Sequence, residues 1–355
     1  YNNPLVMFIG VAIIVWVLTF VQLGGTKYTA RIAKAGFFGG IVVPAIVLFV
    51  GIIAYLVTGH ASQITMGWST FVPDFSKVGT LVIFASFILA FAGVEASASH
   101  VNELKNPGRN YPLAMFILVI VAIVLDALGG LAVAITLPPK VLDGNLSYGV
   151  IEAFRQIFVV TFGEQWGWLV YAMAVLLALG VLAEISSWIV GPSRALLDTA
   201  QQGILPASFA KTNKNGVSVK TVMIQAGIVT IWDAVLCGSM ALSGGSSSSV
   251  SYLTAIGLTV VIYLVAYVLL FVGYLVLVYK HQDLPRTYQI PGGKVFKTIV
   301  AIVGLLVTLA TLVISFFPSS ELDAASNTVY VATLIVCFLI SLAIPFVIYG
   351  LRKHW

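Results

Sequence analysis

The chain of 355 residues is far more apolar than a water-soluble protein of its size. Hydrophobic residues make up 60% of it and charged residues 9%, whereas soluble domains carry about 25% charged residues. This composition excludes a soluble enzyme and predicts a protein of the lipid bilayer. The net charge of +5 comes from 18 basic and 13 acidic residues, and the basic ones stand singly or in short groups between apolar runs. That distribution argues against a nucleic-acid groove.

Nine apolar runs are long enough to cross a bilayer as helices, since a crossing needs about 20 apolar residues. They lie at 5–23, 37–57, 79–99, 112–137, 166–190, 220–242, 250–279, 295–317 and 328–350. A closed β-barrel does not show continuous apolar stretches of this length. Turn-forming segments separate the runs, among them 106–108, 244–246 and 291–293. The sequence therefore predicts an all-α polytopic membrane protein with a single transmembrane domain over residues 1–355.

The basic residues gather on one side of the predicted bundle. When loops are counted alternately, the side that holds the first loop carries fifteen of the eighteen Lys and Arg residues. Short cytoplasmic loops are enriched in these residues, so we expect the loops 100–111, 191–219 and 280–294 to be cytoplasmic. The chain is then a multi-pass protein of the cell's inner (plasma) membrane, with its carboxyl terminus in the cytoplasm.

Metal and nucleophile chemistry has no recognisable pattern in this sequence. The two cysteines, Cys237 and Cys337, lie inside apolar runs and lack the paired spacing of a metal site or a disulfide framework. We interpret them as small packing residues. No cluster of His, Cys and Asp with the spacing of a catalytic site stands out. We therefore expect neither an enzyme nor a bound metal or cofactor.

Four acidic residues lie inside the predicted spans, namely Glu95, Asp126, Glu184 and Asp233, whereas every Lys and Arg is counted in a loop. An ionised side chain near the bilayer centre costs at least about 2.5–3.5 kcal/mol, so such acids usually face a polar cavity, a proton path or an ion site. The alternative is a permanently protonated acid that is hydrogen-bonded to a neighbouring helix. Asp126 and Asp233 have no motif around them that favours either role.

Small residues surround Glu95, where the segment 91–99 reads FAGVEASAS. Glycine and serine lower helix propensity and offer competing hydrogen bonds, so the backbone can unwind where protein or water protects it. A break of this kind points the N–H groups of a half-helix at the membrane centre, where they suit a carboxylate. The same residues also suit a packing face for a neighbouring helix, and the pattern alone favours neither interpretation.

Longer motifs along the chain carry a family resemblance. They are GVEAS at 93–97, NPGRNYPLA at 106–114, LAEISSWIVGPSR at 182–194, GILP at 203–206, NKNGV at 213–217, the pair Tyr263 and Tyr267, and IPGGK at 290–294. This set resembles the amino-acid antiporters of the APC superfamily over the whole length of the chain. The GVEAS and AEISSW strings are most similar to the glutamate/GABA antiporter subfamily.

That resemblance implies an APC/LeuT-like inverted-repeat fold. The family has twelve helices, in which helices 1–5 and 6–10 form the repeat, and this chain would correspond to helices 4 to 12. The first three helices, one of which supplies half of the substrate site, and the cytoplasmic carboxyl-terminal plug would be absent. We therefore expect a partial transporter domain truncated to nine transmembrane helices, which does not transport by itself.

The resemblance also implies the residues of the substrate path: Gly93, Glu95, Glu184, Trp188, Tyr263 and Tyr267. Glu95 matches an acid just after a break in the sixth helix that is implicated in proton-dependent behaviour. Glu184 matches an acid of the eighth helix that faces the path, and Trp188, one turn later, matches an aromatic of the pocket. The two tyrosines match tenth-helix residues at the path, with ordinary interhelical packing as their alternative role.

The function implied by the resemblance is secondary active antiport of extracellular glutamate for intracellular GABA by alternating access. Together with a cytoplasmic glutamate decarboxylase, this exchange would remove protons from the cell and give acid resistance. Because the half-site has acids and no base, we expect protons on the substrate or on the protein acids during uptake. The alternatives are another APC exchanger or permease, for cationic or neutral amino acids, and a membrane sensor or subunit that does not transport.

Overall fold

The computed structural model describes residues 3–65, 67–138, 141, 148–242, 248–317 and 324–352, and the regular elements in these ranges are helices. Within this part of the chain, eight helical stretches are long and apolar enough to cross a membrane. They are Pro4–Leu23, Thr26–Val57, Pro107–Thr136, Glu164–Gln201, Val219–Gly238, Ala255–Lys280, Gly293–Ile314 and Tyr330–Leu351. The predicted all-α polytopic membrane fold is confirmed, whereas the count of nine spans is not.

The chain divides into two compact units. Unit 1 comprises Tyr1–Thr70, Ile123–Ser251 and Ile348–Trp355, and unit 2 comprises Phe71–Ala122 and Tyr252–Val347. The predicted site residues are shared between them, because Glu184 and Trp188 belong to unit 1 and the other four belong to unit 2.

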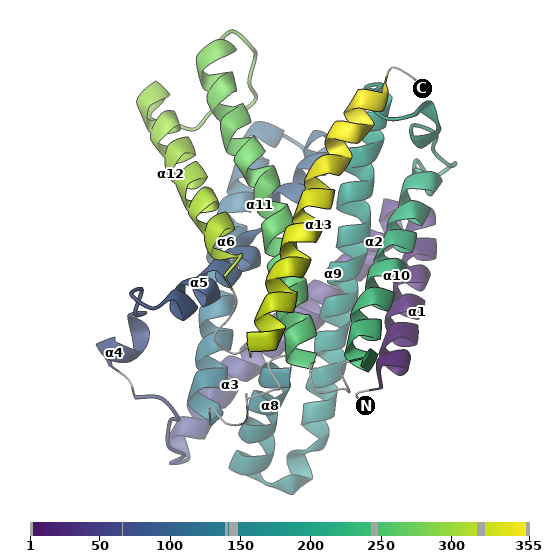
Figure 1. Ribbon diagram of the computed structural model, residues 1–355. Helices are drawn as coiled ribbons and strands as arrows, with labels where there is room; N and C mark the ends of the chain where they lie inside the picture. The colour runs from purple at the N-terminus through teal and green to yellow at the C-terminus, as the bar shows by residue number, and fades with distance from the viewer. Residues whose placement is uncertain are drawn as a thin grey trace. The chain divides into compact units, whose positions relative to one another are not determined.

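Unit 1 is built around the long helix α9. Its elements are α1 (Pro4–Leu23), α2 (Thr26–Ala35), the π-helix η1 (Gly36–Val42), α3 (Val43–Val57), most of the short α4 (Trp68–Phe71), the carboxyl-terminal part of α6 (Pro107–Thr136), α8 (Gly149–Arg155), the π-helix η4 (Gln156–Val160), the 3-10 helix η5 (Glu164–Trp166), α9 (Trp168–Gln201), the 3-10 helix η6 (Ala207–Phe209) and α10 (Val219–Leu242). Helix α1 lies beside α10 (Figure 1), and both pack against α9. The end of α1 is closed by Asn213 and Asn215, whose side-chain amides each donate to the Leu23 carbonyl at 2.9 Å. These contacts satisfy a carbonyl that the helix itself leaves without a donor.

Two buried clusters hold unit 1 together. In the first, Phe154 and Ile157 are fully buried where α3, α6, α8, η4 and α9 meet. The second joins α1, α9 and the start of α10 through Leu18, Ile189, Val217 and Val222. In a membrane such clusters stabilise through close packing, because lipid tails are as apolar as the side chains. The second cluster fixes the part of α9 that carries Glu184 and Trp188.

Small residues let η1 approach α9 closely. A Cβ atom added at Gly36 would collide with Ala183, and one added at Gly40 would collide with the backbone of Gly180. The spacing of Gly36 and Gly40 is the four-residue spacing that places small residues on one helix face in membrane helix pairs. A larger side chain at either glycine would push α9 away from η1, and Glu184 follows Ala183 directly.

Unit 2 contains α5 (Val78–Phe91), the 3-10 helix η2 (Val94–Glu103), the amino-terminal part of α6, most of α11 (Ser248–Lys280), α12 (Gly293–Ile314) and most of α13 (Ala324–Leu351). Helix α5 packs against α12. The absence of a side chain at Gly304 of α12 makes room for the Phe271 ring of α11, and Gly257 of α11 does the same for Tyr330 of α13. These contacts hold α11, which carries Tyr263 and Tyr267.

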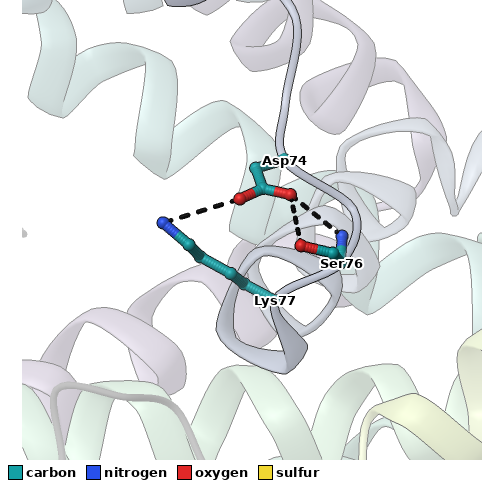
Figure 2. Close-up of polar contacts among 3 residues, drawn as sticks. All are labelled: Asp74, Ser76 and Lys77. Atoms are coloured by element: carbon teal, nitrogen blue, oxygen red, sulfur yellow. Dashed lines mark hydrogen bonds and ion pairs between the residues drawn. The ribbon is translucent and has the colours of Figure 1, made fainter.

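A tight turn precedes α5 (Figure 2). One oxygen of the Asp74 carboxylate accepts hydrogen bonds from the Ser76 hydroxyl at 2.6 Å and the Ser76 N–H at 3.1 Å, and the other lies 3.6 Å from the Lys77 ammonium. Hydrogen bonds to a carboxylate favour its charged form. Those from Ser76 therefore lower the pKa of Asp74 below its ordinary value, with a smaller contribution from Lys77.

Two of the predicted turns are confirmed. Asn106 has a φ of +49°, and α6 begins directly after it at Pro107. Gly292 and Gly293 have φ values of +96° and +73° at the start of α12. Glycine adopts these left-handed values without the strain of a side chain. The third turn-forming segment, 244–246, lies outside the described residues.

Three predicted spans differ from the structure. The run 37–57 belongs to one helical stretch that begins at Thr26, so Lys27, Arg31 and Lys34, which the prediction counted in a loop, lie on α2. The run 79–99 is divided into the 14-residue α5 and the 10-residue η2, so it is not one continuous helix. The run 166–190 continues as α9 to Gln201, with Pro192 inside the helix. The prediction that a loop begins at 191 is therefore wrong, and Arg194 lies on a helix.

Candidate functional site

The backbone breaks at Gly93, between α5 and η2. Gly93 has φ of +99° and ψ of −12°, and the tighter 3-10 helix starts at the next residue. Residues with a Cβ atom rarely adopt such a positive φ. The serines of the segment support the change, because Ser97 Oγ donates to the Val94 carbonyl at 2.6 Å and Ser99 Oγ donates to the Ala96 carbonyl at 3.0 Å. Of the two interpretations of this segment, the structure shows the break.

Glu95 lies directly after the break and accepts three hydrogen bonds. The Tyr263 hydroxyl donates to Oε1 at 2.5 Å, and the Tyr267 hydroxyl donates to Oε2 at 2.5 Å. The Gly93 N–H also donates to Oε2, at 3.2 Å. Four of the six predicted path residues thus meet around one carboxylate, which we call the Glu95 cluster: Gly93, Glu95, Tyr263 and Tyr267.

The local sequence explains how α11 supplies both hydroxyls. Tyr263 and Tyr267 are four residues apart, so they lie one above the other on one helix face. Their ring centroids are 5.7 Å apart, and the Tyr267 ring also lies 6.5 Å from the Phe271 ring. This stack directs two phenol groups toward the two oxygens of Glu95.

The Glu95 cluster has a different hydrogen-bond pattern in each protonation state. An ionised carboxylate only accepts, and here it accepts from both tyrosines and from Gly93. A protonated carboxyl carries one O–H donor and keeps acceptor capacity on both oxygens, so a tyrosine hydroxyl can then accept from Glu95 as well as donate to it. Protonation of Glu95 thus adds a donor between the helix break and α11 within unit 2.

Glu184 and Trp188 of α9 line a cavity of about 310 Å³ in unit 1. The cavity lies between α1, α9 and α10, and its wall is formed by Val15, Thr19, Glu184, Ile185, Trp188, Ile189, Val222, Gln225, Ala226 and Val229. The four residues from α9 fall at one-turn spacing, so one face of that helix forms its side of the wall.

Pro192 explains why Gln225 is at this cavity. Proline has no N–H, so Pro192 cannot donate to the carbonyl of Trp188, four residues earlier in α9. Gln225 of α10 supplies the donor, because its Nε2 group bonds the Trp188 carbonyl at 2.9 Å. The helix continues through the proline because a neighbouring helix satisfies the carbonyl.

Sequence reasoning missed Thr19 and Gln225. Thr19 lies in the apolar span 5–23 and Gln225 in the span 220–242. A polar residue inside an apolar span was the sequence feature that could have identified each of them. Of the two aspartates without an assigned role, Asp233 accepts a hydrogen bond from the Cys237 thiol at 3.5 Å. Neither Asp233 nor Asp126 is among the cavity-lining residues or in the Glu95 cluster.

The comparisons with known proteins place this architecture in a family. Residues 1–340 match the family model described as amino acid permease. The chain is 51% identical over 351 residues to the glutamate/gamma-aminobutyrate antiporter of Lactococcus lactis subsp. lactis (strain IL1403), covering 99% of this chain and 68% of that protein. An uncharacterized transporter of Legionella pneumophila is 30% identical over 333 residues, covering 94% of this chain and 68% of that protein.

The fold and the matches define a multi-pass membrane protein of a transporter class. The chain belongs to the amino acid permease family. The family that the sequence motifs indicated is thereby confirmed.

Proposed function

We propose that this chain belongs to a secondary active antiporter that takes up extracellular glutamate and releases intracellular GABA by alternating access. The observation that carries the proposal is the 51% identity, over 99% of this chain, to a protein named as a glutamate/gamma-aminobutyrate antiporter. A second such relative, from Lactococcus lactis subsp. cremoris (strain MG1363), has the same identity and coverage.

The Glu95 cluster gives the proposal its chemistry. The break at Gly93 frees backbone groups beside Glu95, and freed N–H groups suit a substrate carboxylate. Glu184, Trp188, Tyr263 and Glu95 are side chains of the substrate path in this proposal. An ionised Glu95 repels the carboxylates of glutamate, because like charges in a low-dielectric site repel strongly. Protons on the acids or on the substrate remove that repulsion, so uptake is favoured in acid.

The exchange serves acid resistance when a cytoplasmic glutamate decarboxylase converts the imported glutamate to GABA. Decarboxylation consumes a cytoplasmic proton, and export of GABA completes the cycle. In this proposal the protein lies in the inner (plasma) membrane. Its carboxyl terminus faces the cytoplasm, because it lies on the predicted side that carries fifteen of the eighteen basic residues, and cytoplasmic loops are enriched in such residues.

Counterflow into proteoliposomes tests the proposal. Vesicles that contain the full-length protein and are loaded with GABA should take up radiolabelled glutamate at acidic external pH. Vesicles loaded with lysine or alanine should not, which separates this exchanger from permeases of cationic and neutral amino acids. A thermal unfolding transition verifies that the protein is folded. Absence of uptake by such protein with every load would favour a membrane sensor and contradict the proposal.

Two Tyr→Phe substitutions on α11 distinguish an effect on the substrate path from a general loss of stability. Tyr263→Phe removes one hydroxyl from Glu95, whereas Tyr279→Phe removes an exposed hydroxyl of the same helix that bonds Thr298 at 3.0 Å. We expect Tyr263→Phe to change glutamate uptake at least several-fold and Tyr279→Phe to leave it close to wild type. Equal effects would remove the Glu95 cluster from the substrate path.

A further inference from the structure

Helix α2 of unit 1 has one face that carries three basic residues, Lys27, Arg31 and Lys34. At about 100° per residue, these positions fall within about 60° of one another around the helix. All three residues are exposed. On the opposite side of the helix Thr29 is buried, and its hydroxyl donates to the Gln22 side chain of α1. Helix α2 also packs against α9, so the three residues, which we call the α2 basic face, are held on a fixed surface.

The α2 basic face has no negative charge near it to balance it. Residues 1–73 contain no Asp or Glu, and Lys27, Arg31 and Lys34 are the Lys and Arg residues of that segment. Within the described residues, none of the three side chains takes part in an ion pair or a hydrogen bond. The face therefore presents three charges that are available to an external anion.

Other exposed basic residues differ, because their ammonium groups already contact a neighbouring side chain. These contacts are the Ser208 hydroxyl at 2.7 Å for Lys220, the Tyr279 ring centroid at 4.4 Å for Lys294, and Gln289 Oε1 at 2.6 Å for Lys297. The α2 basic face thus combines an equal number of charges with free donors.

The length of the helix places the α2 basic face at the edge of the membrane. The helical stretch Thr26–Val57 has 32 residues, or about 48 Å at 1.5 Å per residue, whereas the hydrocarbon core is about 30 Å thick. The apolar part of the stretch, from Phe37 to Val57, already covers about 32 Å. Lys34 and Arg31 lie about 4–9 Å before it. The headgroup layer adds about 5–8 Å on each side, so both residues reach it with their long side chains.

We propose that the α2 basic face binds the headgroup of an anionic phospholipid, namely phosphatidylglycerol. The Arg31 guanidinium offers paired N–H donors to the phosphate, and Lys27 and Lys34 lie one turn away on either side. A zwitterionic headgroup brings an ammonium group, which three cations repel. The acyl chains lie along the apolar surface that follows, where Phe37 and Phe38 are 42% and 55% exposed.

Native mass spectrometry of the full-length protein in a neutral detergent tests the proposal. The protein is titrated with phosphatidylglycerol and with phosphatidylcholine of the same acyl chains. We expect the first phosphatidylglycerol to bind with a Kd at least tenfold below that of phosphatidylcholine. Millimolar sn-glycerol 3-phosphate, which has the phosphate without acyl chains, should leave the bound lipid in place. Displacement by this soluble phosphate would contradict a lipid site.

Two triple variants locate the site. Lys27→Gln, Arg31→Gln and Lys34→Gln together remove the α2 basic face, and we expect the Kd for phosphatidylglycerol to rise at least tenfold. The control combines Lys220→Gln, Lys294→Gln and Lys297→Gln, which removes the same charge from residues that have partners within the protein. We expect its Kd to stay within twofold of wild type.

A conservative variant separates recognition of the phosphate from charge alone. Arg31→Lys keeps the positive charge and removes the paired donors of the guanidinium. We expect its Kd for phosphatidylglycerol to lie between those of the wild-type protein and the α2 triple variant.

Three results would overturn the proposal. They are equal Kd values of the wild-type protein for the two lipids, an unchanged Kd in the α2 triple variant, or an equal loss in the control triple variant. The first result is also the one expected if another segment of the full-length chain covers the face, and it needs no variant. Glutamate and GABA play no part in these measurements, so this proposal and the proposed exchange can fail separately.

Discussion

Gln225 stabilises α9 because its side-chain amide replaces the N–H that Pro192 lacks. Removal of this amide should therefore lower the free energy of unfolding by a measurable amount. In Gln225→Leu the Trp188 carbonyl loses the hydrogen bond of 2.9 Å from α10. The bond lies at an exposed position of α9, and a carbonyl that faces lipid or detergent chains without a donor costs about 1–3 kcal/mol. In Pro192→Ala, the new Ala N–H can donate to the same carbonyl within the helix. Gln225→Leu should therefore cost clearly less in that background.

The assay is a double-mutant cycle on the free energy of unfolding in mixed detergent micelles, followed by tryptophan fluorescence. We expect Gln225→Leu to destabilise the wild-type background by about 1–3 kcal/mol, and a coupling energy with Pro192→Ala of at least about 1 kcal/mol. The control is Gln165→Leu, which removes an amide bond of the same length, 2.9 Å, to the Phe162 carbonyl three residues earlier, in the turn before α9. Its cost should be small, since water replaces the bond. An equal cost of Gln225→Leu in both backgrounds would refute the reasoning.

Two further predictions concern the start and the end of α5. Ser76→Ala should raise the pKa of Asp74, measured by carboxyl NMR, more than Lys77→Met does, because Ser76 is the main cause of the lowered pKa. Asp74 should contribute to the free energy of unfolding at pH values above its pKa in the unfolded chain. This contribution should be lost as the pH falls through its lower pKa in the folded protein. Gly93→Ala should destabilise by about 1–2 kcal/mol through its φ of +99° and reduce uptake. Gly129→Ala, with open space around it, should do neither.

Part of the site could be predicted because its signals are local. Tyr263 and Tyr267 are one helical turn apart, and Glu95 follows a glycine in a run of small residues. These spacings show which residues share a helix face and where a helix can break. The resemblance to the antiporters brought the two segments together, and the structure joins them through hydrogen bonds of 2.5 Å.

The rest could not be predicted, because it depends on contacts between distant segments. Proline usually ends or kinks a helix, so a loop after 190 was the reasonable prediction. The helix continues because Gln225, 37 residues after Trp188, satisfies the exposed carbonyl. Thr19 likewise reads as an ordinary polar residue in an apolar run. Its unmet hydroxyl is visible only when α1, α9 and α10 are packed together.

The pH profile of glutamate/GABA exchange by Glu95→Gln tests the central claim most directly. A glutamine resembles the protonated acid in shape and charge, so it removes the repulsion of glutamate that an ionised Glu95 causes at higher pH. The control is Asp198→Asn, which neutralises an exposed acid of α9. In proteoliposomes of the full-length protein, we expect Glu95→Gln to shift the range of activity to higher pH and Asp198→Asn to leave it in place. A profile of Glu95→Gln that coincides with wild type would contradict a proton-responsive Glu95 cluster in the substrate path.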